Sequence, residues 1–164
     1  MQAISYGIAL WIPYYGTGVN SVEPYLFRSQ MTPAIGLGLD PASYPNGYVE
    51  LKKLLGQWRE AAGNYSGDYY PLTPYSLEST AWMAWQFDSP GKSEGMVQAF
   101  RRPDSPFETA RFRLRGLDAK RTYAIRNADS SEAIRMSGAE LLERGLPVVL
   151  KDCPGAALLS YRAD

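Results

Sequence analysis

The chain has 164 residues, and 17 Lys and Arg balance 17 Asp and Glu, so its formal charge at pH 7 is zero. This length fits one domain, or one domain with an appendage, and a hydrophobic content of 45% is enough to build a core. Balanced charge argues against nucleic acid as a partner, because phosphate binding depends on an excess of Lys and Arg.

The side-chain inventory restricts the chemistry further. The sequence has no His, which excludes Ser-His-Asp triads, Cys-His dyads and His-rich metal sites. Acid–base chemistry would fall to Asp, Glu, Tyr, Lys or the single thiol of Cys153, which has no disulfide partner within the chain. We therefore expect neither a metal ion nor a cofactor. No run of 18 apolar residues occurs, so we expect no membrane-spanning helix and no membrane partner.

Short apolar runs bounded by Gly and Pro mark the N-terminal part. Residues 8–13 and 31–40 are such runs, and the pattern is typical of strands buried on both faces of a parallel sheet. Periodicity alone also permits a buried helix. In the second run, Pro33 and three glycines favour a strand or irregular backbone.

An amphipathic helix is predicted over residues 48–62. Its apolar side chains recur at the i, i+3, i+4, i+7 spacing of one helical face, and charged residues take the other side. Asn46 is expected to cap the start of this helix, and Gly63 to end it.

A period-two pattern replaces these runs from about residue 67. Apolar and polar residues alternate in short segments separated by Gly and Pro turns, which indicates an antiparallel β-sandwich. One short helix interrupts the series, with a capping box from Ser137 to Glu140 and an end at Gly145. We expect a mainly β fold, with a segment over 1–66 and the sandwich over 67–164. The strand candidates are 81–87, 95–101, 109–115, 121–126, 148–150 and 156–161.

Candidate binding residues lie in the N-terminal segment. Tyr14 and Asn20 flank a Gly-rich stretch, and aromatic faces beside amide groups suit a sugar ring. A packed loop whose rings cover the core is the alternative. Asp40 ends an apolar run. At the carboxyl end of a barrel strand it would lie where active sites are built, whereas an Asp before Pro41 also opens a solvated turn.

Tryptophans and arginines of the second half allow further interpretations. Trp82 and Trp85 are three apart on one predicted strand, so they point to opposite faces. One is expected in the core, and the other covers an interdomain surface or binds sugar. Six arginines alternate with apolar residues, which predicts a solvated sheet face, with salt bridges to a neighbouring domain as the second interpretation. They are Arg101, Arg102, Arg111, Arg113, Arg115 and Arg121.

The order of several motifs resembles one known family. Residues 25–40 resemble the last strand of the catalytic barrel in family 36 alpha-galactosidase-like glycoside hydrolases, and the helix at 48–62 resembles the final barrel helix. Later segments of the chain resemble the C-terminal antiparallel domain of that family. They are 68–75, 81–85, 113–118 (Arg-Leu-Arg-Gly-Leu-Asp), Tyr123 and 137–146 (Ser-Gly-Ala-Glu-Leu-Leu-Glu-Arg-Gly-Leu).

This resemblance covers nearly the whole chain and implies both a fold and a chemistry. It implies that residues 1–66 contain a strand and helix remnant of a (β/α)₈ barrel. It also implies retaining hydrolysis by two carboxylates about 5–5.5 Å apart. In the family both lie on earlier barrel strands, and their phrases do not occur here, so no catalytic residue is carried over. At most, Tyr14, Asn20, Arg28 and Asp40 would line the rim of a site that the barrel completes.

Two hypotheses about function follow. The first is a C-terminal fragment of an alpha-galactosidase-like glycoside hydrolase, structural in role and catalytically incomplete alone. Its partners would be the missing barrel domain or a second copy, and carbohydrate through the parent enzyme. The alternative is a stand-alone carbohydrate-binding or protein-interaction β-sandwich, with Trp82 or Trp85 in a groove. A carboxylate pair within this chain, such as Asp40 with Glu23 or Asp68, has no support in the spacing.

Overall fold

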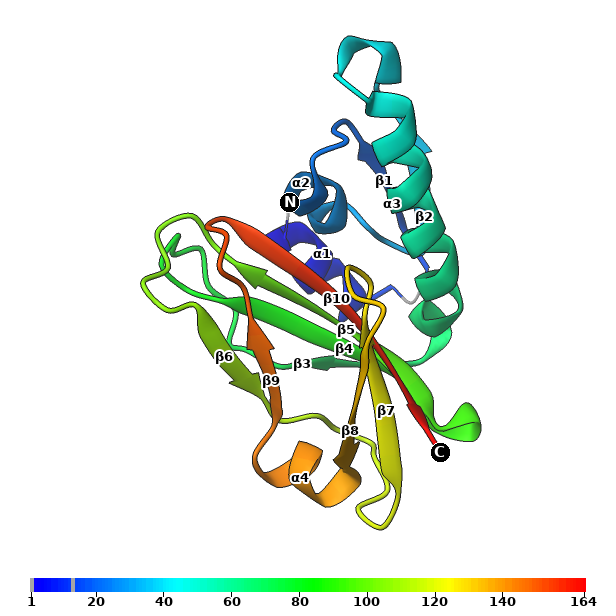
Figure 1. Ribbon diagram of the computed structural model, residues 1–164, viewed down its shortest axis with the longest axis vertical. Coiled ribbons are helices and arrows are strands. Elements are labelled where there is room, and N and C mark those ends of the chain that lie inside the picture. Colours follow the sequence, from blue (N-terminus) through cyan, green and yellow to red (C-terminus); the bar gives the residue numbers. More distant parts are fainter. Residues whose placement is uncertain (1, 13) are drawn as a thin grey trace.

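The computed structural model describes residues 2–12 and 14–164. A large sheet lies at its centre, with helices against one face and a small sheet with a short helix against the other (Figure 1). The α-helices are α1 (Gln2–Ala9), α2 (Pro24–Ser29), α3 (Gly47–Ala62) and α4 (Gly138–Glu143). The strands are β1 (Gly16–Val19), β2 (Ala34–Leu37), β3 (Asp68–Pro71), β4 (Met83–Ser89), β5 (Glu94–Arg101), β6 (Thr109–Phe112), β7 (Thr122–Asn127), β8 (Ala133–Ser137), β9 (Leu146–Val149) and β10 (Gly155–Ala163).

The central sheet has six strands in the order β3-β4-β5-β10-β7-β8, and all neighbouring pairs are antiparallel. Although β10 comes last in the sequence, it lies between β5 and β7. Ser160, for example, is paired with Met96 on one side and with Arg126 on the other. The middle of the sheet is therefore completed only by the C-terminal strand.

Each face of this sheet covers its own hydrophobic core. Alternate residues of β4, such as Trp85 and Phe87, point toward the helices and pack with Phe27 and Leu54. The intervening Ala84 points to the opposite face, where the second core includes Phe112 of β6. The small β6–β9 sheet covers that face, so the predicted mainly β fold with an antiparallel β-sandwich is confirmed.

The N-terminal segment forms the helical layer and one parallel strand pair. β1 and β2 run parallel, with Gly16 opposite Ala34 and Val19 opposite Leu37. The expectation of strands buried on both faces is wrong here, because β2 is half-buried at best and Leu37 is 51% exposed. Each of these strands has one partner in the described residues, and the segment does not close into a barrel there.

The first apolar run does not form a strand. Residues 8 and 9 end the helix α1, and 10–12 follow in a turn whose amides donate to carbonyls of that helix. Pro13, the last residue of the run, lies outside the described residues. The short apolar run contains too little periodicity to separate a strand from the end of a helix.

The helix predicted over 48–62 is confirmed as α3, which ends before Gly63. The expected cap by Asn46 is wrong. Its side chain makes no capping hydrogen bond, and its backbone is left-handed with φ of 55°. By contrast, Ser137 caps α4 as expected, because its hydroxyl accepts from the Glu140 backbone N–H at 3.2 Å, which is one of the two hydrogen bonds of a capping box. Gly145, with φ of 82°, follows the end of this helix.

The sequence pattern did not predict β1, α2 or the two edge strands of the central sheet. The helix α2 lies at the start of residues 25–40, which resemble a barrel strand in sequence. β3 and β8 form the two edges of the central sheet. In β8 only Met136 is buried, so the segment lacks the alternation that marks a half-buried strand. In the described part of the chain, no helix combines the length and the apolar composition needed to cross a membrane.

Candidate functional site

The parallel pair β1–β2 brings two of the four candidate residues to one edge. Asn20 directly follows β1, and Asp40 lies beyond the end of β2, so both are at the carboxyl edge of the pair. Tyr14 precedes β1 and lies at the opposite edge, where it is 71% exposed. The structure therefore separates Tyr14 from the other two.

Asp40 opens a turn. Its Oδ1 accepts from the Ala42 amide at 3.0 Å, and its Oδ2 accepts from the Ser43 hydroxyl at 3.4 Å. It thereby caps the short 3₁₀ helix Pro41–Ser43, as the turn interpretation predicted. The Asn20 side chain is also engaged, because its Oδ1 accepts from the Gln30 amide nitrogen at 2.8 Å.

Arg28 connects three distant parts of the chain. Its guanidinium forms a two-pronged ion pair with Asp129, with nitrogen–oxygen distances of 2.6 and 2.7 Å. It also donates to the Ala156 carbonyl at 2.7 Å and to the Gln57 side-chain oxygen at 2.9 Å. Because Arg28 is buried, its head group faces the sheet and α3 rather than solvent. No local sequence signal connects it with Asp129, which lies 101 residues away.

The contacts of the Asp129 carboxyl lower its pKa from the ordinary value. The main cause is its hydrogen bonding to Arg28, against which partial burial acts, and Gln57 and Lys53 add to the lowering. Asp129 is thus held in its charged form where the β7–β8 turn meets α2 and α3.

A second polar network is buried on the sandwich side of the central sheet. The Tyr161 hydroxyl donates to Asp88 Oδ1 at 2.6 Å, and the Gln86 amide donates to the Tyr161 oxygen at 2.6 Å. Asp88 Oδ2 is buried without a hydrogen-bond partner among the described residues, beside Gly116. Burial raises the pKa of the Asp88 carboxyl, while the Tyr161 hydrogen bond lowers it and Asp68 raises it further. Sequence reasoning singled out none of these three network residues.

The two tryptophans differ in exposure, since Trp82 is half-buried and Trp85 is buried. Trp85 is only 2% exposed, and its indole nitrogen donates to Gln98 at 2.9 Å. Trp82 packs at the other face against Phe112, with ring centres 6.0 Å apart, and donates to the Phe107 carbonyl. The prediction of opposite faces is confirmed, whereas the idea of Trp85 as a sugar platform is wrong because burial leaves no face for a ligand.

Five of the six arginines divide into two groups, and the sixth, Arg121, is half-buried and donates to the Ser93 hydroxyl at 2.7 Å. Arg111, Arg113 and Arg115 are exposed, as a solvated sheet face predicts. For Arg101 and Arg102 that interpretation is wrong, because both are buried. Arg101 donates to the Leu150 carbonyl at 2.8 Å, and Arg102 to two carbonyls in the 76–78 loop. Alternation of residue type alone does not reveal that the loops fold over these side chains.

An apolar patch lies exposed around the end of α1. It consists of Leu10, Trp11, Ile12 and Tyr14, of which Trp11 is 87% exposed. A cavity of about 240 Å³ borders the patch and is lined by Tyr15, Tyr69 and Phe87 among others. The side chains of this patch are therefore apolar groups that the described residues leave in contact with solvent.

Comparison with known proteins assigns the second half of the chain. Residues 82–159 match the profile of the glycosyl hydrolase family 36 C-terminal domain. No curated protein shows significant similarity to the sequence.

Among solved structures, the galactosidase domain of the alpha-galactosidase-sucrose kinase AgaSK matches with a TM-score of 0.80 and 18% identity, covering 98% of this chain and 24% of that chain. Two family 36 alpha-galactosidases from Geobacillus stearothermophilus are also similar. AgaB has a TM-score of 0.69 and 21% identity, and AgaA has 0.70 and 19%; each match covers 91% of this chain and 22% of the other. The chain thus spans about a quarter of the length of the structures it matches, and the likeness is one of fold.

Proposed function

Because residues 82–159 form a glycosyl hydrolase family 36 C-terminal domain, we propose that the chain is the accessory C-terminal portion of an alpha-galactosidase-like glycoside hydrolase. In this role it braces a catalytic barrel and does not cleave glycosides alone. The similarity of fold to AgaSK supports the proposal, since it extends over 98% of the chain and therefore beyond the matched domain.

The observation that carries this proposal is the unpartnered outer surface of the N-terminal segment. The apolar patch on α1 is exposed, and β1 and β2 each have one strand neighbour in the described residues. Parallel strands normally occur in sheets covered on both faces and continued on both sides. A barrel that supplied further strands and helices would cover this surface. On this proposal, residues 1–66 are the end of that barrel.

Three aspartates of the chain are engaged in structural contacts, which is consistent with a role that does not include catalysis. A retaining glycosidase needs a nucleophile and an acid about 5–5.5 Å apart at the sugar. Asp40 caps a turn, Asp88 is buried against Tyr161, and Asp129 is paired with Arg28. These three acids stabilise structure at separate places, so none is free to act as half of such a pair.

An activity assay tests the catalytic part of this proposal. The purified chain should release no product from an aryl alpha-galactoside, and robust turnover would contradict the proposal.

The docking surface has its own test. Trp11→Ser combined with Ile12→Ser should reduce self-association and the binding of a hydrophobic dye, because Trp11 and Ile12 are both exposed in the patch. Leu77→Ser is the matched control, since Leu77 is 75% exposed but lies outside the patch. Equal dye binding by the patch variant and the control would argue against a docking surface at α1.

A further inference from the structure

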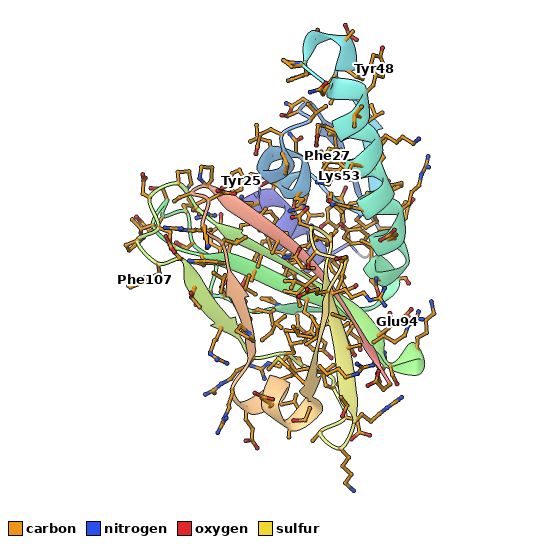
Figure 2. All side chains as sticks on the ribbon, in the orientation of Figure 1. Tyr25, Phe27, Tyr48, Lys53, Glu94 and Phe107 are labelled. Atoms are coloured by element: carbon orange, nitrogen blue, oxygen red, sulfur yellow. The ribbon has the colours of Figure 1, made fainter. Side chains whose placement is uncertain are left out.

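The helical layer covers only part of the central sheet. Along β10, Leu158 packs in the core beneath the helices, but the next residues on the same face, Ser160 and Arg162, are exposed. Arg126 of β7 is paired with Ser160 and shares this face. The sheet therefore continues as a polar strip beyond the helices. Glu94, at the start of β5, lies at this end of the molecule, far from Tyr48 at the other end of α3 (Figure 2).

Two adjoining cavities lie where this strip meets the C-terminal half of α3. Their volumes are about 250 and 380 Å³, and Glu60, Arg126 and Ser160 line both. Small-molecule pockets typically measure roughly 300–1,000 Å³, and the two cavities together fall in that range. We call them the α3 groove.

The three shared residues have free polar groups. Within residues 2–12 and 14–164, the side chains of Glu60, Arg126 and Ser160 form no ion pair. The neighbouring charges are already neutralised, because Arg162 is paired with Glu94 and Arg135 with Asp164. The groove thus presents one guanidinium, one carboxylate and one hydroxyl with unused hydrogen-bonding capacity.

We propose that the α3 groove binds a neutral saccharide. Neighbouring sugar hydroxyls offer two acceptors to a planar guanidinium and donate to a carboxylate, which matches Arg126 and Glu60. Leu158 and Ala61 also border the groove, but both are buried in the core, so they offer little surface to a ligand. The carboxylate of Glu60 opposes a phosphate, and the polar lining opposes a purely apolar molecule.

This site is separate from the four candidate residues of the N-terminal segment. It uses residues of α3, β7 and β10, none of which was predicted to bind sugar from the sequence. The residues that line the groove support a saccharide site independently of the proposed function. Only the choice of an alpha-galactoside as the first probe rests on the proposed function.

Nuclear magnetic resonance titration of the whole ¹⁵N-labelled chain with raffinose tests the proposal. We expect the amide signals around Arg126 and Ser160 to shift and saturate, and Arg126→Ala to weaken the binding at least about ten-fold. Arg113→Ala is the matched control, because it removes another exposed arginine from a position outside the groove. Circular dichroism of both variants verifies that the fold is kept.

Three outcomes would overturn the saccharide site. Raffinose, galactose, glucose and maltose could all leave the spectrum unchanged. A saccharide could bind with equal affinity to wild type and Arg126→Ala, which would place binding elsewhere. Inorganic phosphate could shift the same signals while no sugar does, which would make the groove an anion site. None of these outcomes bears on catalytic completeness, which the activity assay measures.

Discussion

Two aspartates of this chain stand in opposite electrostatic surroundings. Asp129 accepts from the Arg28 guanidinium, which lowers the pKa of its carboxyl. Asp88 is buried beside Tyr161, and that burial raises the pKa of its carboxyl. The two groups therefore contribute to stability with opposite dependence on pH.

Removal of the Asp129 carboxylate tests how much its ion pair with Arg28 contributes to stability. We expect Asp129→Ala to lower the free energy of unfolding by about 2 kcal/mol at pH 7, because it strands a buried guanidinium and hydrogen bonds to charged groups contribute about 1.5–3 kcal/mol each. Urea unfolding measures this loss, with the exposed Asp104→Ala as control. The loss should shrink as the pH falls below the ordinary Asp pKa of about 3.9, since the pair contributes only while Asp129 is charged. An equal loss at every pH would exclude the ion pair as its cause.

The contribution of Asp88 to stability should change with pH in the opposite direction. A carboxyl whose pKa is raised in the folded protein favours folding in its neutral form, so its contribution is present below the unfolded pKa and is lost as the pH rises through the folded pKa. Asp88→Asn removes this titration while keeping an oxygen that can accept from Tyr161. We expect wild type to lose stability relative to Asp88→Asn as the pH rises above the ordinary Asp pKa of about 3.9. Parallel stability curves for the two proteins over this range would contradict the expectation.

At the scale of elements, the packing around a helical glycine determines whether the position can accept a larger side chain. Gly56 lies inside α3, and an added Cβ there meets nothing within 4 Å. Gly138 begins α4, and a Cβ there would overlap the backbone carbonyl of Asp118. The two positions share a helical backbone but differ in the space around it.

A matched pair of substitutions separates propensity from packing. Gly56→Ala should raise the free energy of unfolding by about 0.5–1 kcal/mol, because Ala is the better helix former. Gly138→Ala should lower it by about 1–3 kcal/mol, because the backbone must shift to admit the methyl group. Thermal and urea unfolding of both variants measure the effects. Stabilisation by both substitutions would mean that the contact at Asp118 yields easily.

Elements were predicted well where their own periodicity is strong. α3 and the interior strands β4, β5, β7 and β10 follow from apolar spacing, because each buries a regular face. The edge strand β8 was missed, since most of its side chains are exposed and no periodic burial marks it. The end of α1 was taken for a strand because a short apolar run carries no clear period.

At the scale of the whole molecule, one hydrophobic core joins the two halves of the chain. Tyr6, Phe27 and Leu54 from the N-terminal segment pack with Trp85 and Phe100 from the central sheet. Arg28 adds a polar link across the same boundary. The helical layer and the sheet therefore depend on each other for burial.

This shared core predicts one cooperative unfolding transition. Tryptophan fluorescence, to which the buried Trp85 contributes, and far-UV circular dichroism should give coincident urea transitions. The reason is that separation of the two halves would expose both sides of the core at once. Two resolved transitions would indicate that residues 1–66 and 67–164 unfold as independent units.

By itself, the sequence determined the class of the fold, the helix α3 and most of the sandwich strands. These properties follow from patterns within short stretches of chain, which local periodicity and turn residues record. Only the tertiary structure decided that Arg28 lies buried against Asp129, that Asp88 meets Tyr161, and that Arg126 and Glu60 border one groove. Each of these pairs joins residues far apart in the sequence, and no local pattern encodes which strands and helices will meet.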